Sequence, residues 1–336
     1  MILAGDGQAS MHAAANVLLS GGLIGLPTET VYGLAADAEN PQAVAKIFQT
    51  KGRPADHPLI VHVYDFAAVP HFASEVPDFA RALMHAFWPG PLTVILPRRP
   101  EVAAAAAGGQ NTVGLRCPSH PVARNLLKQL RPGAGALGEI HGLAAPSANL
   151  FGRVSPTTAQ HVRDELGDDL LVLDGGPCHV GIESTIVDCS RGQPVLLRPG
   201  AITAAQLEAV CGLPVVGPDT LRDVLPAAPK ASGTLASHYA PSAKVRLLDA
   251  QGLRSALAER SQTSGQVAVW WRSAPLPSAA GLSVQAMPEQ ADVAAYELFA
   301  TLRAFDALGV QEIWVEPPPA DPEWDGVRDR LQRAAF

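Results

Sequence analysis

The sequence predicts an α/β or α+β protein with two unequal domains. Short apolar runs alternate with helical stretches along the 336 residues. The 30 glycines and 30 prolines exceed average usage, which indicates many tight loops rather than a helical bundle. A Pro-rich stretch over residues 213–242 is followed by a second strand–helix cycle. We therefore predict domains at 1–212 and 243–336, joined by a linker at 213–242.

The first domain is predicted to alternate between helices and short buried strands. A helix over residues 10–19 ends at Gly21-Gly22, and Asn40-Pro41 begins the next helix with a capping side chain and a first-turn proline. Strands are expected where apolar runs are short and bounded by turn residues. They lie at residues 23–26, 58–63, 92–96, 112–116, 170–174, 185–189 and 195–198, and further helices at 42–50, 76–87, 121–130 and 157–166.

The second domain repeats this alternation over a shorter length. Apolar runs predict strands, and apolar residues at helical spacing predict the helices between them. Strands are expected at 244–248, 266–271 and 313–315, and helices at 253–260, 293–308 and 324–334. This pattern is typical of a small parallel α/β domain.

Composition excludes several classes of protein. Apolar residues make up 47% of the chain, enough for a sizeable core, so wholesale disorder is excluded. The 25 basic and 32 acidic residues give a net charge of −7, which argues against a dedicated nucleic-acid binder. The four cysteines form no CxxC pair, and no positively charged segment opens the chain. We expect free thiols, no metal held with confidence by protein side chains, no membrane association and a cytoplasmic location.

Cations and hydroxyls gather where predicted strands and helices end. Strand alternation puts Thr112 and Arg116 on one face, and an inward-facing arginine needs a carboxylate or a ligand as its partner. Lys51 and Arg53 follow a helix, where they could offset the helix dipole or bind phosphates. Together with Arg198, and without an activated nucleophile, this set favours a triphosphate bound beside a small polar acid, with catalysis by positioning and charge.

Nine motifs in this order resemble the YrdC-like family of threonylcarbamoyl-AMP synthases in its long two-domain form. They are 27–34 (PTETVYGL), 46–54 (KIFQTKGRP), 58–62 (PLIVH), 88–96 (WPGPLTVIL), 112–118, 144–149 (AAPSAN), 181–188 (GIESTIVD), 197–200 (LRPG) and 238–241 (HYAP). The last 95 residues match the family by length and pattern only. The resemblance implies a twisted mixed sheet with helices, plus a smaller Rossmann-like parallel α/β domain.

The resemblance also implies an activity. Members of the family make threonylcarbamoyl-AMP and pyrophosphate from L-threonine, bicarbonate and ATP, and the product serves threonylcarbamoyladenosine formation in tRNA. Magnesium is expected to arrive with ATP, held mostly by phosphates. A downstream tRNA-modifying transferase complex is the expected partner, and direct tRNA contact stays open.

Site residues are carried over motif by motif. The threonine site is expected at Thr28, His62, Arg116, Ala145 and Ser184. The nucleotide site is expected at Lys51, Arg53, Thr112, Ser147, Asn149, Ser155, Arg198 and Tyr239. Lys51, Arg53 and Arg116 are expected to support catalysis, and the linker is expected to cross the mouth of the pocket as a lid.

Two departures from the family pattern and two alternatives accompany this interpretation. Ser232-Gly233-Thr234 and Ser237 replace the usual residues before HYAP, and Gly114-Leu115 replace Ala-Val in the strand that carries Arg116. One alternative is a carbamoyl-transfer hydrogenase-maturation factor, which would need CxxC zinc repeats. The other is a non-catalytic RNA- or ribosome-binding module on the same fold, which the acidic balance of residues 1–200 disfavours.

Overall fold

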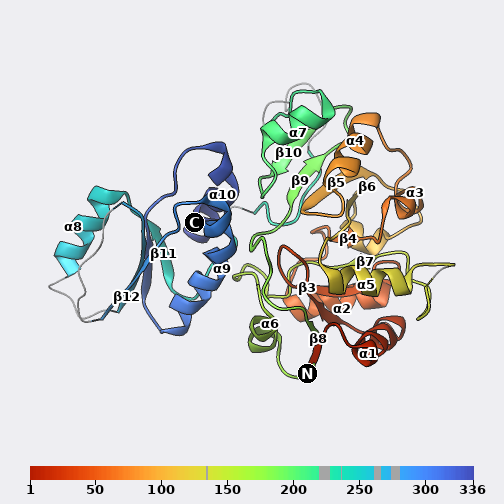
Figure 1. Cartoon of the computed structure of the whole chain (residues 1–336), viewed down its shortest axis with the longest axis horizontal. Helices are drawn as coiled ribbons and strands as arrows, with labels where there is room; N and C mark the ends of the chain where they lie inside the picture. Colours follow the sequence, from red (N-terminus) through yellow and green to blue (C-terminus); the bar gives the residue numbers. More distant parts are fainter. Residues whose placement is uncertain (134, 219–227, 236, 261–265, 274–280) are drawn as a thin grey trace. The chain divides into compact units, whose positions relative to one another are not determined.

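The computed structural model of the chain describes residues 1–133, 135–218, 228–235, 237–260, 266–273 and 281–336. These residues form two compact units. The first holds Met1–Phe151 and Ser155–Thr234, and the second holds Gly152–Val154 and Leu235–Phe336. In Figure 1 the first unit is coloured from red to green and the second mainly in cyan and blue. The predicted linker is thus divided between the two units, and its residues 219–227 and 236 lie outside the described residues.

The first unit is built on a mixed ten-stranded sheet. Its strands are β1 (Ile2–Ala4), β2 (Ile24–Leu26), β3 (Gly33–Asp37), β4 (Ile60–His62), β5 (Leu92–Pro97), β6 (Thr112–Arg116), β7 (Leu143–Ala144), β8 (Leu171–Asp174), β9 (Thr185–Asp188) and β10 (Val195–Arg198). Their spatial order is β1-β8-β2-β3-β7-β4-β6-β5-β9-β10. β4 pairs with β6 in parallel, whereas β3 and β4 both pair with β7 antiparallel. This mixed sheet confirms the fold class expected from the sequence.

The helices of the first unit bury apolar side chains in its two core clusters. They are α1 (Gln8–Leu19), α2 (Pro41–Lys51), α3 (Val69–Phe72), α4 (Asp78–Phe87), α5 (Pro121–Leu130), α6 (Ala159–Leu166) and α7 (Ala204–Cys211), with short 3-10 turns at Phe66–Ala68 and Ala104–Ala107. The Asn40 side chain accepts the backbone N–H groups of Gln42 and Ala43, as the sequence predicts for the start of α2. Gly52 ends this helix at φ 62°, a conformation that glycine adopts without steric cost.

Both faces of the central strands are buried. Along β3, Leu34 and Ala36 belong to one apolar cluster, together with Ile47 of α2. Ala35 belongs to a second cluster, together with Leu126 of α5. Because successive side chains in a strand point to opposite faces, helices must cover both faces of the sheet at this point. A strand held on both faces is a rigid base for the residues that precede it.

The second unit carries a separate four-stranded parallel sheet. Its elements are β11 (Lys244–Leu247), α8 (Ala250–Arg260), β12 (Val267–Trp271), β13 (Leu282–Ala286), α9 (Ala291–Ala307), β14 (Glu312–Val315), a 3-10 turn at Pro322–Trp324 and α10 (Asp325–Ala334). The strand order is β11-β14-β12-β13, and all three pairings are parallel. The parallel α/β prediction for this part of the chain is confirmed.

Several elements escaped the sequence prediction because they are short or weakly patterned. β1 has three residues and is held by parallel pairing with β8, whereas β13 lies at the edge of its sheet.

None of the helices that the structure describes is long and apolar enough to cross a membrane. All four cysteines are free thiols.

Candidate active site

The segment between β2 and β3 is folded around the side chain of Thr28. Thr28 Oγ1 accepts the backbone N–H groups of Thr30 and Val31, each at 3.2 Å, and donates to Val31 O at 2.6 Å. It also lies 2.9 Å from Thr30 Oγ1. This local side-chain turn replaces secondary structure at the strand end and is buried. The predicted threonine-site residue Thr28 therefore shapes the segment that presents Glu29 and Thr30.

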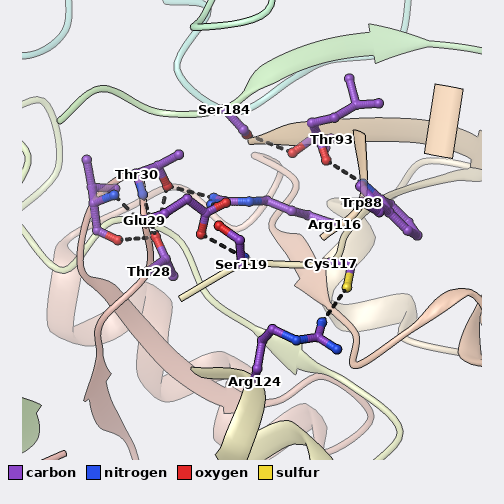
Figure 2. Close-up of polar contacts among 12 residues, drawn as sticks. Thr28, Glu29, Thr30, Trp88, Thr93, Arg116, Cys117, Ser119, Arg124 and Ser184 are labelled. Atoms are coloured by element: carbon purple, nitrogen blue, oxygen red, sulfur yellow. Dashed lines mark hydrogen bonds and ion pairs between the residues drawn. The ribbon is translucent and has the colours of Figure 1, made fainter. Parts of the chain in front are cut away.

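Arg116 meets this segment from the end of β6. Its Nη1 donates to Thr30 Oγ1 at 2.7 Å, and its Nη2 lies 2.7 Å from Glu29 Oε1. The other oxygen of Glu29 accepts the backbone N–H of Ser119 at 3.1 Å. Figure 2 shows the guanidinium directed at Thr30 and Glu29. Glu29 is thus the carboxylate partner that an inward-facing Arg116 requires, and sequence reasoning had not assigned it.

The ion pair leaves Arg116 one nitrogen with which to bind a substrate. Arg116 and Glu29 are about 5% exposed, so their attraction is weakly screened. Arg116 Nε has no hydrogen-bond partner among the described residues. A buried donor without a partner is costly, and a ligand oxygen would satisfy it.

His62 lies beside Arg116 in the sheet. The two residues are register partners in the parallel pair β4–β6. Burial, followed by the charge of Arg116, lowers the pKa of His62 to about 3. The imidazole is therefore neutral at physiological pH, and its Nδ1 has no partner among the described residues. A neutral ring can hydrogen-bond to a polar ligand without placing a second positive charge next to the guanidinium.

Ser184 joins this group through the neighbouring strands. Thr93 lies opposite Arg116 in the antiparallel pair β5–β6, and its hydroxyl lies 2.8 Å from Ser184 Oγ. Both hydroxyls are buried, and Figure 2 shows this contact above Arg116. Arg198 Nε and Nη2 donate to Ser184 O at 3.1 and 2.9 Å. Strand pairing and hydrogen bonds thus connect two residues predicted for the threonine site, Arg116 and Ser184, with one predicted for the nucleotide, Arg198.

Lys51 ends α2 and reaches the AAPSAN segment. Its Nζ donates to Ser147 O at 2.6 Å and to Asn149 O. Burial, followed by the positive charge of Arg53, lowers the pKa of Lys51 to about 7. Near neutral pH the Lys51 side chain is therefore present in both its neutral and its charged form. An anion bound here would stabilise the charged form and draw a proton onto the lysine.

Arg53 and Arg198 converge on one residue of the linker. Arg53 Nη2 donates to Ser232 Oγ at 3.3 Å and to Pro58 O at 3.0 Å. Arg198 Nη1 donates to Ser232 O at 2.9 Å. Both guanidinium groups are buried, although their residue types are usually exposed. Two cations predicted for the nucleotide thus also hold the linker at Ser232.

An ion pair and hydrogen bonds at Lys230 also hold this stretch of the linker. Lys230 Nζ lies 2.6 Å from Asp56 Oδ2, and the Gln110 side chain exchanges hydrogen bonds of 2.7 and 3.1 Å with the Lys230 backbone. The segment borders a cavity of about 300 Å³, part of which is open solvent. This cavity is lined by Pro58, Leu59, Ile60, Thr93, Ile95, Gln110, Thr112, Gly114, Ile186, Lys230, Ala231 and Ser232. Residues 230–232 therefore line the same cavity as the predicted nucleotide residue Thr112.

The other predicted residues have different surroundings. Ala145 donates its backbone N–H to Ile60 O at 3.1 Å, and Ser155 Oγ donates to Glu183 Oε1 at 2.5 Å. Tyr239 lies in the second unit, fully buried, with its ring centroid 5.4 Å from that of Phe299. The contacts of Glu29, Thr93 and Ser232 were missed. Glu29 stands inside the PTETVYGL motif, which was the available signal.

Comparisons with known proteins decide the family. A family model described as "Telomere recombination" matches residues 16–200, and one described as "Threonylcarbamoyl-AMP synthase, C-terminal domain" matches residues 202–336. The threonylcarbamoyl-AMP synthase of Bacillus subtilis (strain 168) is 38% identical over 328 residues, which cover 96% of this chain and 92% of that protein. The chain belongs to the threonylcarbamoyl-AMP synthase family.

Further relatives of this family support the same assignment. The threonylcarbamoyl-AMP synthase of Pyrococcus abyssi is 41% identical over 241 residues, covering 71% of this chain and 68% of that protein. The crystal structure described as P. abyssi Sua5 complexed with L-threonine superposes with a TM-score of 0.85 at 35% identity, covering 97% of this chain and 94% of that one. The family predicted from the motifs, its fold and its synthase class are confirmed, and the non-catalytic alternative gains no support. The roles of single residues stay predictions.

Proposed function

We propose that this chain forms threonylcarbamoyl-AMP and pyrophosphate from L-threonine, bicarbonate and ATP. The observation that carries the proposal is the buried set of Arg116, His62 and Ser184, linked through Arg198 to the cationic nucleotide side. It fits a small amino acid beside a triphosphate. The relatives named threonylcarbamoyl-AMP synthase, one of them crystallised with L-threonine, support the same substrates.

The threonine carboxylate would bind at Arg116. The guanidinium is fixed by Glu29 and Thr30, so little side-chain freedom is lost when a ligand arrives. Its Nε supplies a donor without a present partner. Glu29 balances the charge of Arg116 before the substrate binds, which keeps the empty site stable. Neutral His62 would hydrogen-bond to the amino acid without repelling its ammonium group.

The triphosphate would bind at Lys51, Arg53 and Arg198. In the present structure these cations bond to carbonyl groups and to Ser232. Phosphate oxygens are stronger acceptors because the hydrogen bonds are charge-assisted on both sides. Magnesium is proposed to arrive with ATP, where it neutralises phosphate charge. Glu29 and Glu183 already bond Arg116 and Ser155, so we assign the ion to phosphate oxygens.

The chemistry needs no protein nucleophile. The threonine amine, after losing a proton, adds to the carbon of bicarbonate, and water leaves to give the carbamate. A carbamate oxygen then attacks the α-phosphorus of ATP, and the bond to pyrophosphate breaks. The side chains contribute by holding the reacting groups in line and by stabilising charge on the phosphates.

We propose that residues 230–232 act as the lid of this reaction. The carbamate loses carbon dioxide readily in water, so excluding water increases the fraction that reaches ATP. The linker is held by Arg53 and Arg198, the cations assigned to phosphate. Nucleotide binding and linker position would therefore be coupled through the same two guanidinium groups.

The product is a mixed anhydride that transfers its acyl group easily. We propose that a tRNA-modifying transferase complex consumes it in the cytoplasm, where the free thiols would persist.

Pyrophosphate release tests the proposed reaction. The purified chain should release pyrophosphate from ATP only when both threonine and bicarbonate are present, and mass spectrometry should detect threonylcarbamoyl-AMP. Release that ignores either co-substrate would contradict the proposed reaction. The absence of both pyrophosphate and product would contradict it and favour the binding-module alternative.

A further inference from the structure

Three metal-ligating side chains meet outside the site described above. His71 Nε2 and His141 Nδ1 each lie 3.0 Å from the same oxygen, Glu39 Oε2. The two imidazole rings are parallel, at an interplanar angle of 0° and a centroid distance of 3.6 Å. The three ligand atoms all lie within 4.8 Å of one another. None of these residues belongs to the predicted threonine or nucleotide site.

Sheet register brings Glu39 and His141 together. Asp37 of β3 pairs with Leu143 of β7, and Ala38 N continues the antiparallel ladder with a 3.0 Å bond to Gly142 O. One step further along both chains, Glu39 and His141 are cross-strand neighbours, whose side chains lie on the same face. The pair is therefore fixed by the same strands that support the substrate-binding segments.

Helix α3 brings the third side chain. It packs over Gly142, where a Cβ atom would lie 3.0 Å from Phe72 Cζ and 2.7 Å from Val61 Cγ1. The missing side chain at Gly142 lets α3 approach the end of β7, and His71, next to Phe72, then stacks on His141. Three separate chain segments thus present two imidazole nitrogens and one carboxylate oxygen to a common point.

We propose that Glu39, His71 and His141 bind one divalent transition-metal ion of the Zn²⁺ class. Two histidines and one glutamate form a common ligand set for zinc, and water completes the coordination. Ligand atoms around tetrahedral Zn²⁺ at ~2.0–2.2 Å lie roughly 3.3–3.6 Å apart. The two nitrogen–oxygen separations are 3.0 Å, so they would have to widen by a few tenths of an ångström. The two parallel rings would also have to tilt, so that the ion lies in the plane of each imidazole. All three side chains are 30–39% exposed, which leaves the open side accessible to ion and water.

The bound ion would stabilise the fold and would take no part in the reaction. The ion would tie the turn before α2, helix α3 and the segment before β7 to one another. Because such a site does not exist in the unfolded chain, binding stabilises the folded state by mass action. Without metal the same groups form a hydrogen-bonded cluster, which is the competing explanation of the geometry.

Metal titration of the full chain tests the proposal. After removal of metal with a chelator, and without nucleotide, the protein should bind one equivalent of Co²⁺ with the visible absorption of a low-coordinate site. Zn²⁺ should displace the Co²⁺. At a hundredfold excess over Kd, Zn²⁺ should raise Tm by roughly 5–10 °C. Failure to bind either ion at micromolar concentrations would overturn the proposal and leave only the hydrogen-bonded cluster.

Matched variants locate the site. His141→Ala and Glu39→Gln should weaken Zn²⁺ binding by at least ~100-fold, since losing even an outer-shell partner costs 10–100-fold. His12→Ala removes an exposed histidine of α1, and Cys211→Ser removes the one partly exposed thiol. Both controls should bind as the parent does. Unchanged binding in His141→Ala with intact circular dichroism, or loss of binding in Cys211→Ser, would refute this assignment.

Discussion

Arg116 Nη2 lies 2.7 Å from Glu29 Oε1, and both side chains are buried. The arginine comes from the end of β6 and the glutamate from the segment before β3, so the contact joins two distant parts of the sequence. A substrate carboxylate at Arg116 would enter a group that is already neutral overall. This arrangement makes Arg116 important for binding and also for folding, and the two roles can be separated.

Arg116→Ala is expected to weaken threonine binding by roughly 10–150-fold, the value of a lost charge-assisted hydrogen bond. It should also lower the free energy of unfolding by about 3–5 kcal/mol, because Glu29 is left buried and unpaired. Calorimetry with threonine and urea unfolding measure the two effects.

Arg116→Lys is the matched variant. It retains a charge for Glu29 but loses the planar fork, so stability should recover more than threonine affinity does. Equal threonine affinity in the parent and in both variants would contradict the assignment of Arg116.

ATP affinity should depend on pH through Lys51. Its pKa is about 7 in the structure, and bound phosphate would raise it, so binding takes up a proton. Affinity is then highest below pH 7 and falls as the pH rises above 7. From pH 7.5 to 8.5 the affinity should therefore decrease, by no more than about tenfold, the limit per pH unit for one proton. Calorimetry in two buffers measures how many protons the protein takes up when ATP binds.

Lys51→Arg is the control for this titration. Arginine stays charged throughout the range, so the slope above pH 7.5 should flatten in the variant. The same slope in the parent and in Lys51→Arg would mean that another group titrates.

Gln110→Ala should loosen the linker. The Gln110 side chain makes two hydrogen bonds to the Lys230 backbone, and their loss removes one of the attachments of the segment that borders the cavity. We expect less threonylcarbamoyl-AMP per ATP consumed, because water reaches the carbamate. Gln129→Ala, which removes an exposed bond to Asn125, is the control. An unchanged ratio of product to ATP in Gln110→Ala would argue against a lid.

A shortened chain tests the lid more drastically. Sequence reasoning predicts that a chain ending near Gly212 folds and loses much of its product synthesis. The structure favours an end at Gly217, since Leu196 N bonds Val216 O at 2.9 Å. Full product yield from this shortened chain would contradict the proposed role of the linker.

Asn40→Ala should destabilise the first unit by about 1 kcal/mol, the usual cost of a lost helix cap. The Asn40 side chain accepts two backbone N–H groups at the start of α2, the helix that ends at Lys51. Asn40→Ser should restore most of the stability, because serine also caps. Urea unfolding distinguishes the two, and equal loss in both variants would show that capping is not the cause.

The sequence by itself determined the local structure and the family. Asn40-Pro41 and Gly52 set the ends of α2 by capping and backbone freedom, which depend on neighbouring residues only. The ordered motifs identified the synthase, and their residue types indicated anion binding. The free cysteines and the division into a large and a small α/β part also followed from the sequence.

Only the tertiary structure decided which side chains meet. Glu29 pairs with Arg116, and Ser232 with Arg53 and Arg198, across sequence separations of 34 to 179 residues. Glu39 meets His141 because β3 and β7 are antiparallel neighbours, an order that no local pattern specifies. Strand order and register follow from the packing of the whole core, because a shift of one residue would turn every side chain to the opposite face. Partners brought together by register are therefore decided by the fold as a whole.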